Sequence, residues 1–191
     1  MPEKYTPVIF MIFALAFLSI PARAADFPGG FYYDKDTCFE RVYSNKHLRK
    51  HPRQRVAMIR FNHYPKLFGL IGKDDIVDPR LSPGVVYFQI QVRFRGAKRT
   101  GSNSGTCEVR RGKLICQIEC DGGSFQIIRE STDSLLIRND RFTVTGCENG
   151  EETCEDGYFS HWVEPEPDDK AFRLKRLPHN RCIAPLPGTV N

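Results

Sequence analysis

VYFQIQVRFR, from Val86 to Arg95, is the clearest indication of the fold, because apolar and polar residues alternate along its whole length. Valine, phenylalanine and isoleucine occupy the even positions, while tyrosine, glutamine and arginine occupy the odd ones. Side chains of a β-strand point alternately to its two faces, so this pattern predicts a long strand with one buried face. Such a strand is typical of an antiparallel sheet whose other face meets water.

Turn signals divide the sequence around this strand into further short strands. Residues 96–105 (GAKRTGSNSG) predict a glycine- and serine-rich loop. Arg111-Gly112 predicts a two-residue hairpin connection that pairs Val109 with Leu114 and Cys107 with Cys116. The other predicted strands are 56–61, 114–120, 125–129, 135–138, 141–145 and 171–175, with turns at 121–123, 131–134 and 139–140. This regular spacing predicts a mainly β fold, a single antiparallel β-barrel or β-sandwich.

Two other segments differ from the strands. One short N-terminal helix is predicted from about Asn45 to Lys50, where Ser44 is the N-cap and Pro52 ends the helix. Residues 146–169 predict an exposed acidic loop. Its end, EPEPDD, has proline at alternate positions, which favours extended polyproline II. The tail after Cys182 is expected to be frayed.

Residues 1–24 predict a secretory signal peptide. Lys4 supplies a basic start, residues 8–20 are apolar apart from one serine, and Ala22-Arg23-Ala24 is a small-residue cleavage site. The apolar segment is too short to span a bilayer and no later one is longer, so no transmembrane segment is expected after cleavage. Residues 25–191 then fit a single disulfide-bonded domain in the periplasm or outside the cell.

The seven cysteines allow three disulfides and leave one residue over. In the predicted hairpin, Cys107 and Cys116 form a non-hydrogen-bonded pair whose close Cβ atoms suit a bridge. The remaining expected pairs are Cys147 with Cys154 and Cys38 with Cys182, which leaves Cys120 free. An alternative joins Cys120 to Cys147 and frees Cys154, because sequence alone does not determine the pairing.

The sequence predicts no metal, no cofactor and no catalytic residue. His47 and His51 are four positions apart on the predicted helix, but the lysines and arginines around them would repel a cation. In residues 101–105 (GSNSG), Asn103 stands where the nucleophile of a G-x-S-x-G turn belongs. The alternative is a cell-envelope hydrolase, which a deep pocket with convergent histidine and carboxylate groups would favour.

Basic clusters are the main candidates for a binding surface. Residues 46–55 (KHLRKHPRQR) form one cluster. Arg93 and Arg95, at the end of the predicted strand 86–95, form a second cluster with Lys98 and Arg99. Such clusters bind phosphate or carboxylate groups, although a solvated basic face is the alternative interpretation. The candidate ligand-binding residues are Lys46, Arg49, Lys50, Arg53, Arg55, Arg93 and Arg95.

The expected partner is an anionic envelope component or another protein. Nucleic acid is not expected, because the chain is predicted to be exported and its basic clusters lack the interleaved aromatics of a stacking platform. The formal net charge of +5 is a mild excess that fits an anionic partner and fits simple solubility equally well. The aromatic run YFSHW at residues 158–162 is interpreted as the lining of a ligand groove or as part of the core.

Several motifs resemble those of a group of uncharacterised exported proteins of alphaproteobacteria. They are Asp36-Thr37-Cys38, His47-Leu48 with His51-Pro52-x-Gln54-x-Val56, Cys120-Asp121-Gly122-Gly123 and Phe172-Arg173-Leu174. The resemblance spans most of the chain after the signal peptide and implies a periplasmic β-rich protein with no known activity. A more distant resemblance is to the periplasmic inhibitors of c-type lysozyme, small β-barrels with a serine-glycine loop, which Ser104-Gly105 matches. The tyrosine that follows this loop in the inhibitors is replaced around Cys107, so no inhibitory residue is carried over.

Overall fold

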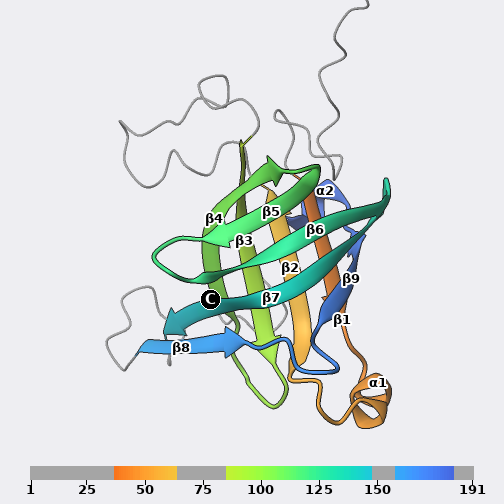
Figure 1. The fold of residues 1–191 in the computed structure, drawn as a ribbon. Coiled ribbons are helices and arrows are strands. Elements are labelled where there is room, and N and C mark those ends of the chain that lie inside the picture. Colours follow the sequence, from red (N-terminus) through yellow and green to blue (C-terminus); the bar gives the residue numbers. More distant parts are fainter. Residues whose placement is uncertain (1–36, 64–84, 148–157, 183–191) are drawn as a thin grey trace, which may run out of the picture.

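The computed structural model describes residues 37–63, 85–147 and 158–182 (Figure 1). The predicted signal peptide, Cys154 and the tail after Cys182 lie outside these ranges, as do residues 148–157 of the predicted acidic loop. No helix in the described ranges has both the length and the apolar character needed to cross a membrane.

The described chain is built mainly from β-strands, with two short helices. The helices are α1 (Asn45–Lys50) and α2 (His179–Cys182). The strands are β1 (Thr37–Val42), β2 (Val56–His63), β3 (Val85–Phe94), β4 (Gly101–Arg110), β5 (Lys113–Ile118), β6 (Gly123–Ser131), β7 (Ser134–Cys147), β8 (Tyr158–Val163) and β9 (Ala171–Arg176).

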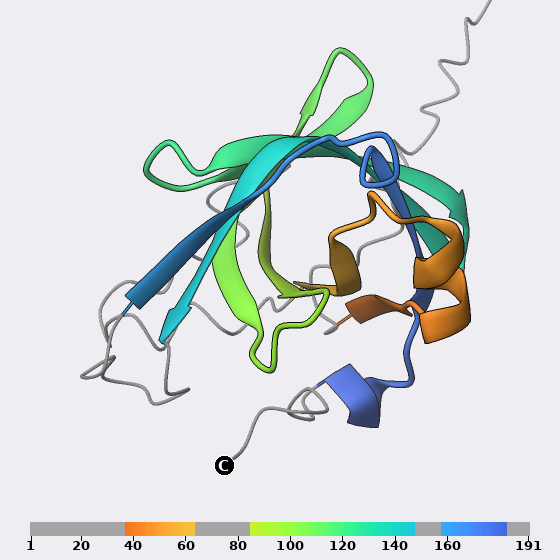
Figure 2. The ribbon, with the colours of Figure 1, turned by 90° about the horizontal axis from the view of Figure 1, so that it is seen from below.

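The strands pair into one antiparallel sheet that closes on itself. Their order is β6-β5-β4-β3-β2-β1-β9-β7-β8, and a further pairing of β6 with β7 closes the ring. Figure 2 shows the ring from its lower end. Closure of this kind is the connectivity of a β-barrel and pairs strand edges that would otherwise be free. Strand β8 lies outside the ring and pairs with the second half of β7.

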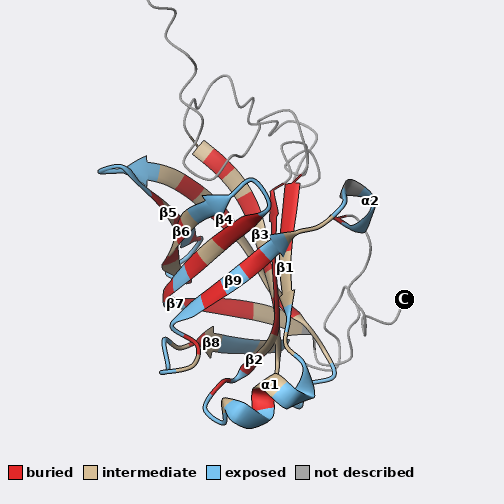
Figure 3. Cartoon of the chain, turned by 90° about the vertical axis from the view of Figure 1, so that its right-hand side faces the viewer, coloured by how far each residue is buried: buried red, intermediate tan, exposed pale blue. Residues whose placement is uncertain are grey.

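Apolar side chains pack the interior of the ring. Strand β3 keeps the predicted alternation, with buried side chains at Val86, Phe88, Ile90 and Val92 and half-buried ones between them (Figure 3). Phenylalanine rings from four strands contact one another, with centroids 5.2 to 6.2 Å apart: Phe61, Phe88, Phe125 and Phe142. Interiors packed in this way leave little room for a ligand, so a binding site is to be sought at the ends or on the outside.

The β4–β5 hairpin has the predicted register. Cys107 lies opposite Cys116 and Val109 opposite Leu114. Both connecting residues are left-handed, with φ of 52° at Arg111 and 75° at Gly112, as a tight two-residue hairpin turn requires.

The described disulfides join Cys107 to Cys116 and Cys38 to Cys182. Both pairs are among those expected from the sequence, and the second ties β1 to α2. Cys120 is free and exposed. The expected pair of Cys147 with Cys154 lies outside the side chains that the structure describes.

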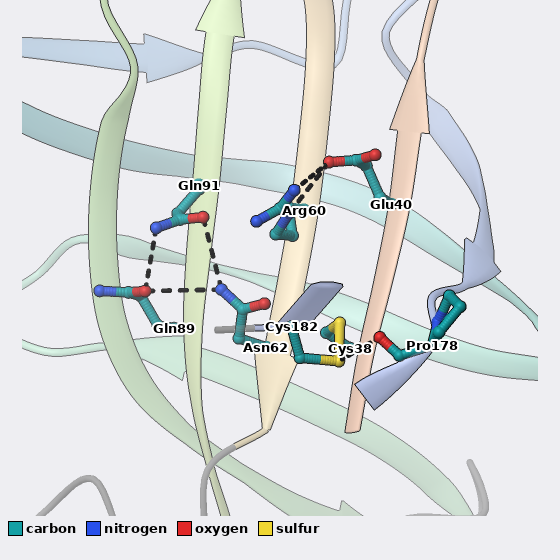
Figure 4. The surroundings of a disulfide bond; sticks show 8 residues. All are labelled: Cys38, Glu40, Arg60, Asn62, Gln89, Gln91, Pro178 and Cys182. Carbon is teal, nitrogen blue, oxygen red and sulfur yellow. Dashed lines mark hydrogen bonds and ion pairs between the residues drawn. A yellow bond between two sulfur atoms is a disulfide. The ribbon is translucent and has the colours of Figure 1, made fainter. Parts of the chain in front are cut away.

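A polar layer covers the outer face of β1, β2 and β3 beside the Cys38–Cys182 bridge (Figure 4). Arg60 donates to Glu40 through Nε at 2.9 Å and Nη2 at 2.6 Å, and the two side chains are only 2% and 8% exposed. The side-chain amide of Asn62 donates to Gln89 and Gln91. Charges buried this deeply need partners, which these contacts supply.

Helix α1 has the predicted bounds. The hydroxyl of Ser44 accepts the main-chain N–H of His47 at 3.2 Å, which is the N-cap contact expected of serine. Leu48 is the buried residue of the helix.

The predicted break at Asn139-Asp140 is wrong, because β7 runs without interruption from Ser134 to Cys147. The register shifts between the pairs Phe125–Asn139 and Gly123–Phe142, and Arg141 has a φ of 87°. The turn-forming residues therefore produce a β-bulge, which bends a strand without reversing the chain.

The predicted loop at 96–105 is too long, because β4 begins at Gly101. A Cβ atom at Gly105 would collide with the main-chain oxygen of Gln117 on the neighbouring strand. Glycine is needed there for close approach of two strands and not for loop flexibility. Ser104-Gly105 therefore lies within a strand and not in a loop.

The predicted acidic loop at 146–169 is also partly wrong. Its second half contains β8, and the extended conformation expected for EPEPDD is replaced by turns. The N–H of Asp169 donates to the carbonyl of Glu166 at 2.9 Å, and that of Glu166 donates to the carbonyl of Glu164 at 2.8 Å. Strand β1 and helix α2 have no counterpart among the predicted elements.

Candidate functional site

The two predicted basic clusters meet at one end of the barrel, the lower end in Figure 1. The main-chain N–H of Arg95 donates to the carbonyl of Arg55 at 2.6 Å. The guanidinium of Arg95 donates to the carbonyl of Leu48 in α1 at 3.2 Å. These contacts hold residues 46–55 against residues 93–99, and we call the two segments together the basic end.

A hollow of about 440 Å³ lies at the basic end, between the β3–β4 connection and β8. Its lining combines cations with aromatic rings and two small residues: Arg55, Lys98, Arg99, Phe94, Phe159, His161, Ala97 and Gly101. We call it the aromatic–basic pocket. Its described lining contains no aspartate or glutamate, so its charge is positive.

The rings of this pocket contact one another in two arrangements. Phe159 stacks with His161 at a centroid distance of 5.2 Å, and Phe94 meets His161 edge-on at 5.5 Å. The guanidinium carbon of Arg55 lies 5.6 Å from the centre of the Phe94 ring, within the range of a cation–π contact. The pocket therefore places a cation directly beside an aromatic wall.

Strand alternation decides which aromatic residues enter the pocket. Phe159 and His161 are two positions apart on β8 and share a face, while Tyr158 and Trp162 belong to the other face. Tyr158 is 63% exposed, and Trp162 packs under the guanidinium of Arg141 at 4.0 Å. Phe94, at the end of β3, packs against the core and also lines the pocket.

Two glycines let the ring of Phe159 lie close to the backbone. A Cβ atom at Gly146 would come within 2.7 Å of its Cζ, and one at Gly101 within 3.1 Å of its Cε2. Strand β7 reaches β4 here, where Ser102 pairs with Thr145. The ring thus rests against the main chains of two strands, and this limits its freedom to move.

A second hollow, of about 350 Å³, adjoins the aromatic–basic pocket and shares Phe94 and Ala97 with it. Arg49, Arg93 and Arg95 line it together with residues of α1. The remaining predicted ligand-binding residues, Lys46, Lys50 and Arg53, are exposed and line none of the three hollows described here. The structure therefore brings together four of the seven predicted basic residues.

Asp169 holds Arg55 in place. Its carboxylate accepts the main-chain N–H of Arg55 at 2.6 Å and that of Val56 at 3.4 Å, and the residue is only 1% exposed. Burial raises the pKa of Asp169, although these hydrogen bonds and the charge of Arg55 lower it in part. The side-chain amide of Asn139 donates to the carbonyls of Val163 and Asp169, which secures the connection between β8 and β9.

A third hollow, of about 610 Å³, contains two histidines and a carboxylate. The rings of Tyr43, His47 and His51 stack in a column, with centroids 4.8 and 4.3 Å apart. His47 Nε2 is hydrogen-bonded to Gln54, and His51 Nδ1 lies 3.5 Å from a carboxylate oxygen of Asp168. The described lining includes no serine, threonine or cysteine.

Sequence reasoning missed the aromatic half of the pocket. The alternation of β3 places Phe94 on the buried face, and the sequence of the run that contains Phe159 and His161 fits both a groove and the core. One signal was available: Phe159 and His161 are two positions apart in a short aromatic run, so in a strand their side chains point to the same face. Nothing in the sequence around Gly101 and Gly146 indicates that both approach one ring.

No protein-family model matches this chain, and no curated protein or solved structure matches it either. Its function is therefore inferred from the basic end and the hollows beside it.

Proposed function

We propose that this chain is an exported binding protein that holds an anionic ligand in the two adjoining hollows of the basic end. The observation that carries the proposal is the convergence of two basic segments, distant in the sequence, around the aromatic–basic pocket. There Arg55 and Lys98 line one hollow together with aromatic rings, and no carboxylate is among the described lining residues. Guanidinium and ammonium groups are the side chains that bind carboxylate and phosphate most strongly.

The balance of charges at the basic end favours an anionic ligand. In the described ranges, the side chains of Arg55, Arg95 and Lys98 form no ion pair. Positive charges gathered at one end of a molecule repel one another, and the buried carboxylate of Asp169 offsets only part of this charge, at Arg55. A bound anion would relieve that repulsion, and the attraction would also speed its association.

Export is supported by two features. Residues 1–24 have the pattern of a signal peptide, and the two described disulfides are of a kind that persists in oxidising compartments. An exported protein meets the anionic lipids and polymers of the cell envelope, which makes such a component our choice of partner.

Binding to vesicles tests this proposal. At about 20 mM salt, where screening is weak, the protein should bind vesicles that contain phosphatidylglycerol and not vesicles of phosphatidylcholine alone. The Arg49→Gln/Arg55→Gln variant removes two cations that line the hollows and should bind about tenfold more weakly.

The Lys46→Gln/Lys50→Gln variant is the matched control, because it removes the same charge from exposed positions of α1 that line no described hollow. It should bind nearly as well as the wild type. Equal losses of vesicle binding in the two variants would show that the basic end acts only as a solvated charged face. Unchanged vesicle binding in both variants would refute the proposal.

A cell-envelope hydrolase is the second candidate, and the proximity of His51 to Asp168 favours it. In that case His51 would act as a general base on water, with Asp168 orienting its ring. The binding proposal expects no hydrolysis of p-nitrophenyl acetate or of peptidoglycan above the buffer rate. Hydrolysis that disappears in His51→Asn would establish the enzyme instead.

A further inference from the structure

We infer that the aromatic–basic pocket takes an aromatic anion, with its ring against Phe159 and its negative group beside Arg55 and Lys98. This inference rests on the proposed function and deepens it, because it names the class of ligand. It is carried by the geometry of the rings, the position of the cations and the size of the hollow.

The rings provide a prepared surface for another ring. Phe159 stacks on His161, and Phe94 meets His161 edge-on, so both of the arrangements that aromatic pairs prefer are present in one wall. The close backbone at Gly101 and Gly146 restricts the ring of Phe159 before any ligand arrives. A surface that is already ordered loses little conformational entropy on binding.

The cations require the ligand to carry negative charge as well. The main chain of Arg55 is fixed on both sides, by the carboxylate of Asp169 and by the N–H of Arg95, each at 2.6 Å. Its guanidinium, beside the Phe94 ring, offers the planar donor fork that suits a carboxylate, sulfonate or phosphate. A neutral ring would offer no negative group to these cations, and an inorganic anion would leave the rings uncovered.

The size of the pocket indicates a small molecule. Its volume of about 440 Å³ lies within the range of roughly 300 to 1,000 Å³ that is typical of small-molecule sites. The packed phenylalanine rings inside the barrel keep such a ligand at the basic end.

Three probes separate the elements of this proposal, with protein expressed from the full-length chain and its disulfides intact. The first, 8-anilinonaphthalene-1-sulfonate, has both a ring system and a charge. N-phenyl-1-naphthylamine lacks the charge, and decanesulfonate has the charge on a linear chain. In calorimetric titrations the first probe should bind at one site and about tenfold more tightly than either of the others, since each lacks one type of contact. Equal affinity for decanesulfonate or for the neutral probe would overturn the inference.

Variants locate the bound probe. Phe159→Leu keeps an apolar side chain without a ring, and Arg55→Gln removes the cation, so each should weaken binding of the aromatic sulfonate about tenfold. Tyr158→Leu is the matched control, because it removes a neighbouring ring on the opposite face of β8 and should leave affinity unchanged. Unchanged affinity in Phe159→Leu, or an equal loss in Tyr158→Leu, would refute the site.

If Phe159→Leu fails to fold, NMR spectroscopy of the unaltered protein tests the site. The aromatic sulfonate should shift the imidazole resonances of His161 and the amide resonance of Gly146. The absence of both shifts would refute the site. Vesicle binding that depends on Arg49 and Arg55, together with probe binding that ignores Phe159, would refute this inference alone. Probe binding that requires Phe159, together with vesicle binding that does not depend on Arg49 and Arg55, would refute the envelope partner and support the aromatic anion as ligand.

Discussion

The carboxylate of Asp169 accepts the main-chain N–H of Arg55 at 2.6 Å, although the two residues are 114 positions apart. Asp169 belongs to the connection between β8 and β9, and Arg55 precedes β2. This one contact therefore ties the strand that carries Phe159 and His161 to the segment that carries Arg55, one of the cations of the pocket. The geometry of the aromatic–basic pocket depends on a buried carboxylate that does not line it.

The Asp169→Asn variant should change how stability depends on pH. Burial raises the pKa of Asp169 above its ordinary 3.8, so the folded protein holds this proton more tightly than the unfolded chain does. The stabilising contribution is then fully present below the ordinary pKa and is lost as pH rises through the raised pKa. Urea unfolding between about pH 4 and pH 7 should show the variant gaining stability relative to the wild type as pH rises. A gain that shrinks with rising pH would contradict this.

The two described disulfides should differ in what they contribute to stability. Cys38–Cys182 spans 144 positions and Cys107–Cys116 spans 9. The chain-entropy model assigns about 5 kcal/mol to the longer loop and about 3 kcal/mol to the shorter one. Urea unfolding of the two double alanine variants, one for each bridge, should preserve this order. A larger loss from the hairpin bridge would show that native-state packing outweighs loop entropy.

Gly105→Ala should be far more destabilising than Gly146→Ala. A Cβ atom at Gly105 meets the main-chain oxygen of Gln117, which cannot move without separating β4 from β5. At Gly146 it meets the end of the Phe159 ring, and a side chain is displaced at lower cost than the main chain of a paired strand. We expect a loss of about 3 kcal/mol for the first and about 1 kcal/mol for the second in urea unfolding. Gly146→Ala should also weaken binding of the aromatic sulfonate, and full affinity in that variant would argue against a seated ring.

Removing one partner of the ion pair between Glu40 and Arg60 should destabilise the protein more than replacing both partners by apolar residues. Both side chains are buried, so Glu40→Gln leaves the guanidinium with a weaker partner and should cost about 3 kcal/mol. The double variant Glu40→Leu/Arg60→Met removes both charges and should be much closer to the wild type. Chemical denaturation of the two variants makes the comparison, and an equal or larger loss in the double variant would contradict it.

The elements that were predicted correctly depend on residues close together in the chain. The period of two from Val86 onward, the N-cap at Ser44 and the register around Arg111-Gly112 all follow from short-range geometry. The basic segments at 46–55 and 93–99 were visible for the same reason, because a charge cluster is a local property of the sequence.

The wrong predictions share a different cause. Asn139-Asp140 resembles a turn, but pairing with β6 on one side and with β8 and β9 on the other keeps β7 extended through its bulge. Gly101 to Gly105 resembles a flexible loop, but the neighbouring strands β3 and β5 convert it into a strand. Hydrogen bonds to distant strands outweigh local turn preference in both places.

Contacts between near neighbours in the chain made three features predictable: the mainly β fold, the place of the longest alternating strand, and the two cysteines that face each other across the hairpin. That Arg55, Phe94 and Phe159 share one pocket becomes visible only in the folded molecule. Arg55 reaches it through the pairing of β2 with β3, and Phe159 through the pairing of β8 with β7. The approach of β7 to β4, where Ser102 pairs with Thr145, brings the two sides of the pocket together. Such pairings between distant strands belong to the folded chain as a whole, and no local pattern carries them.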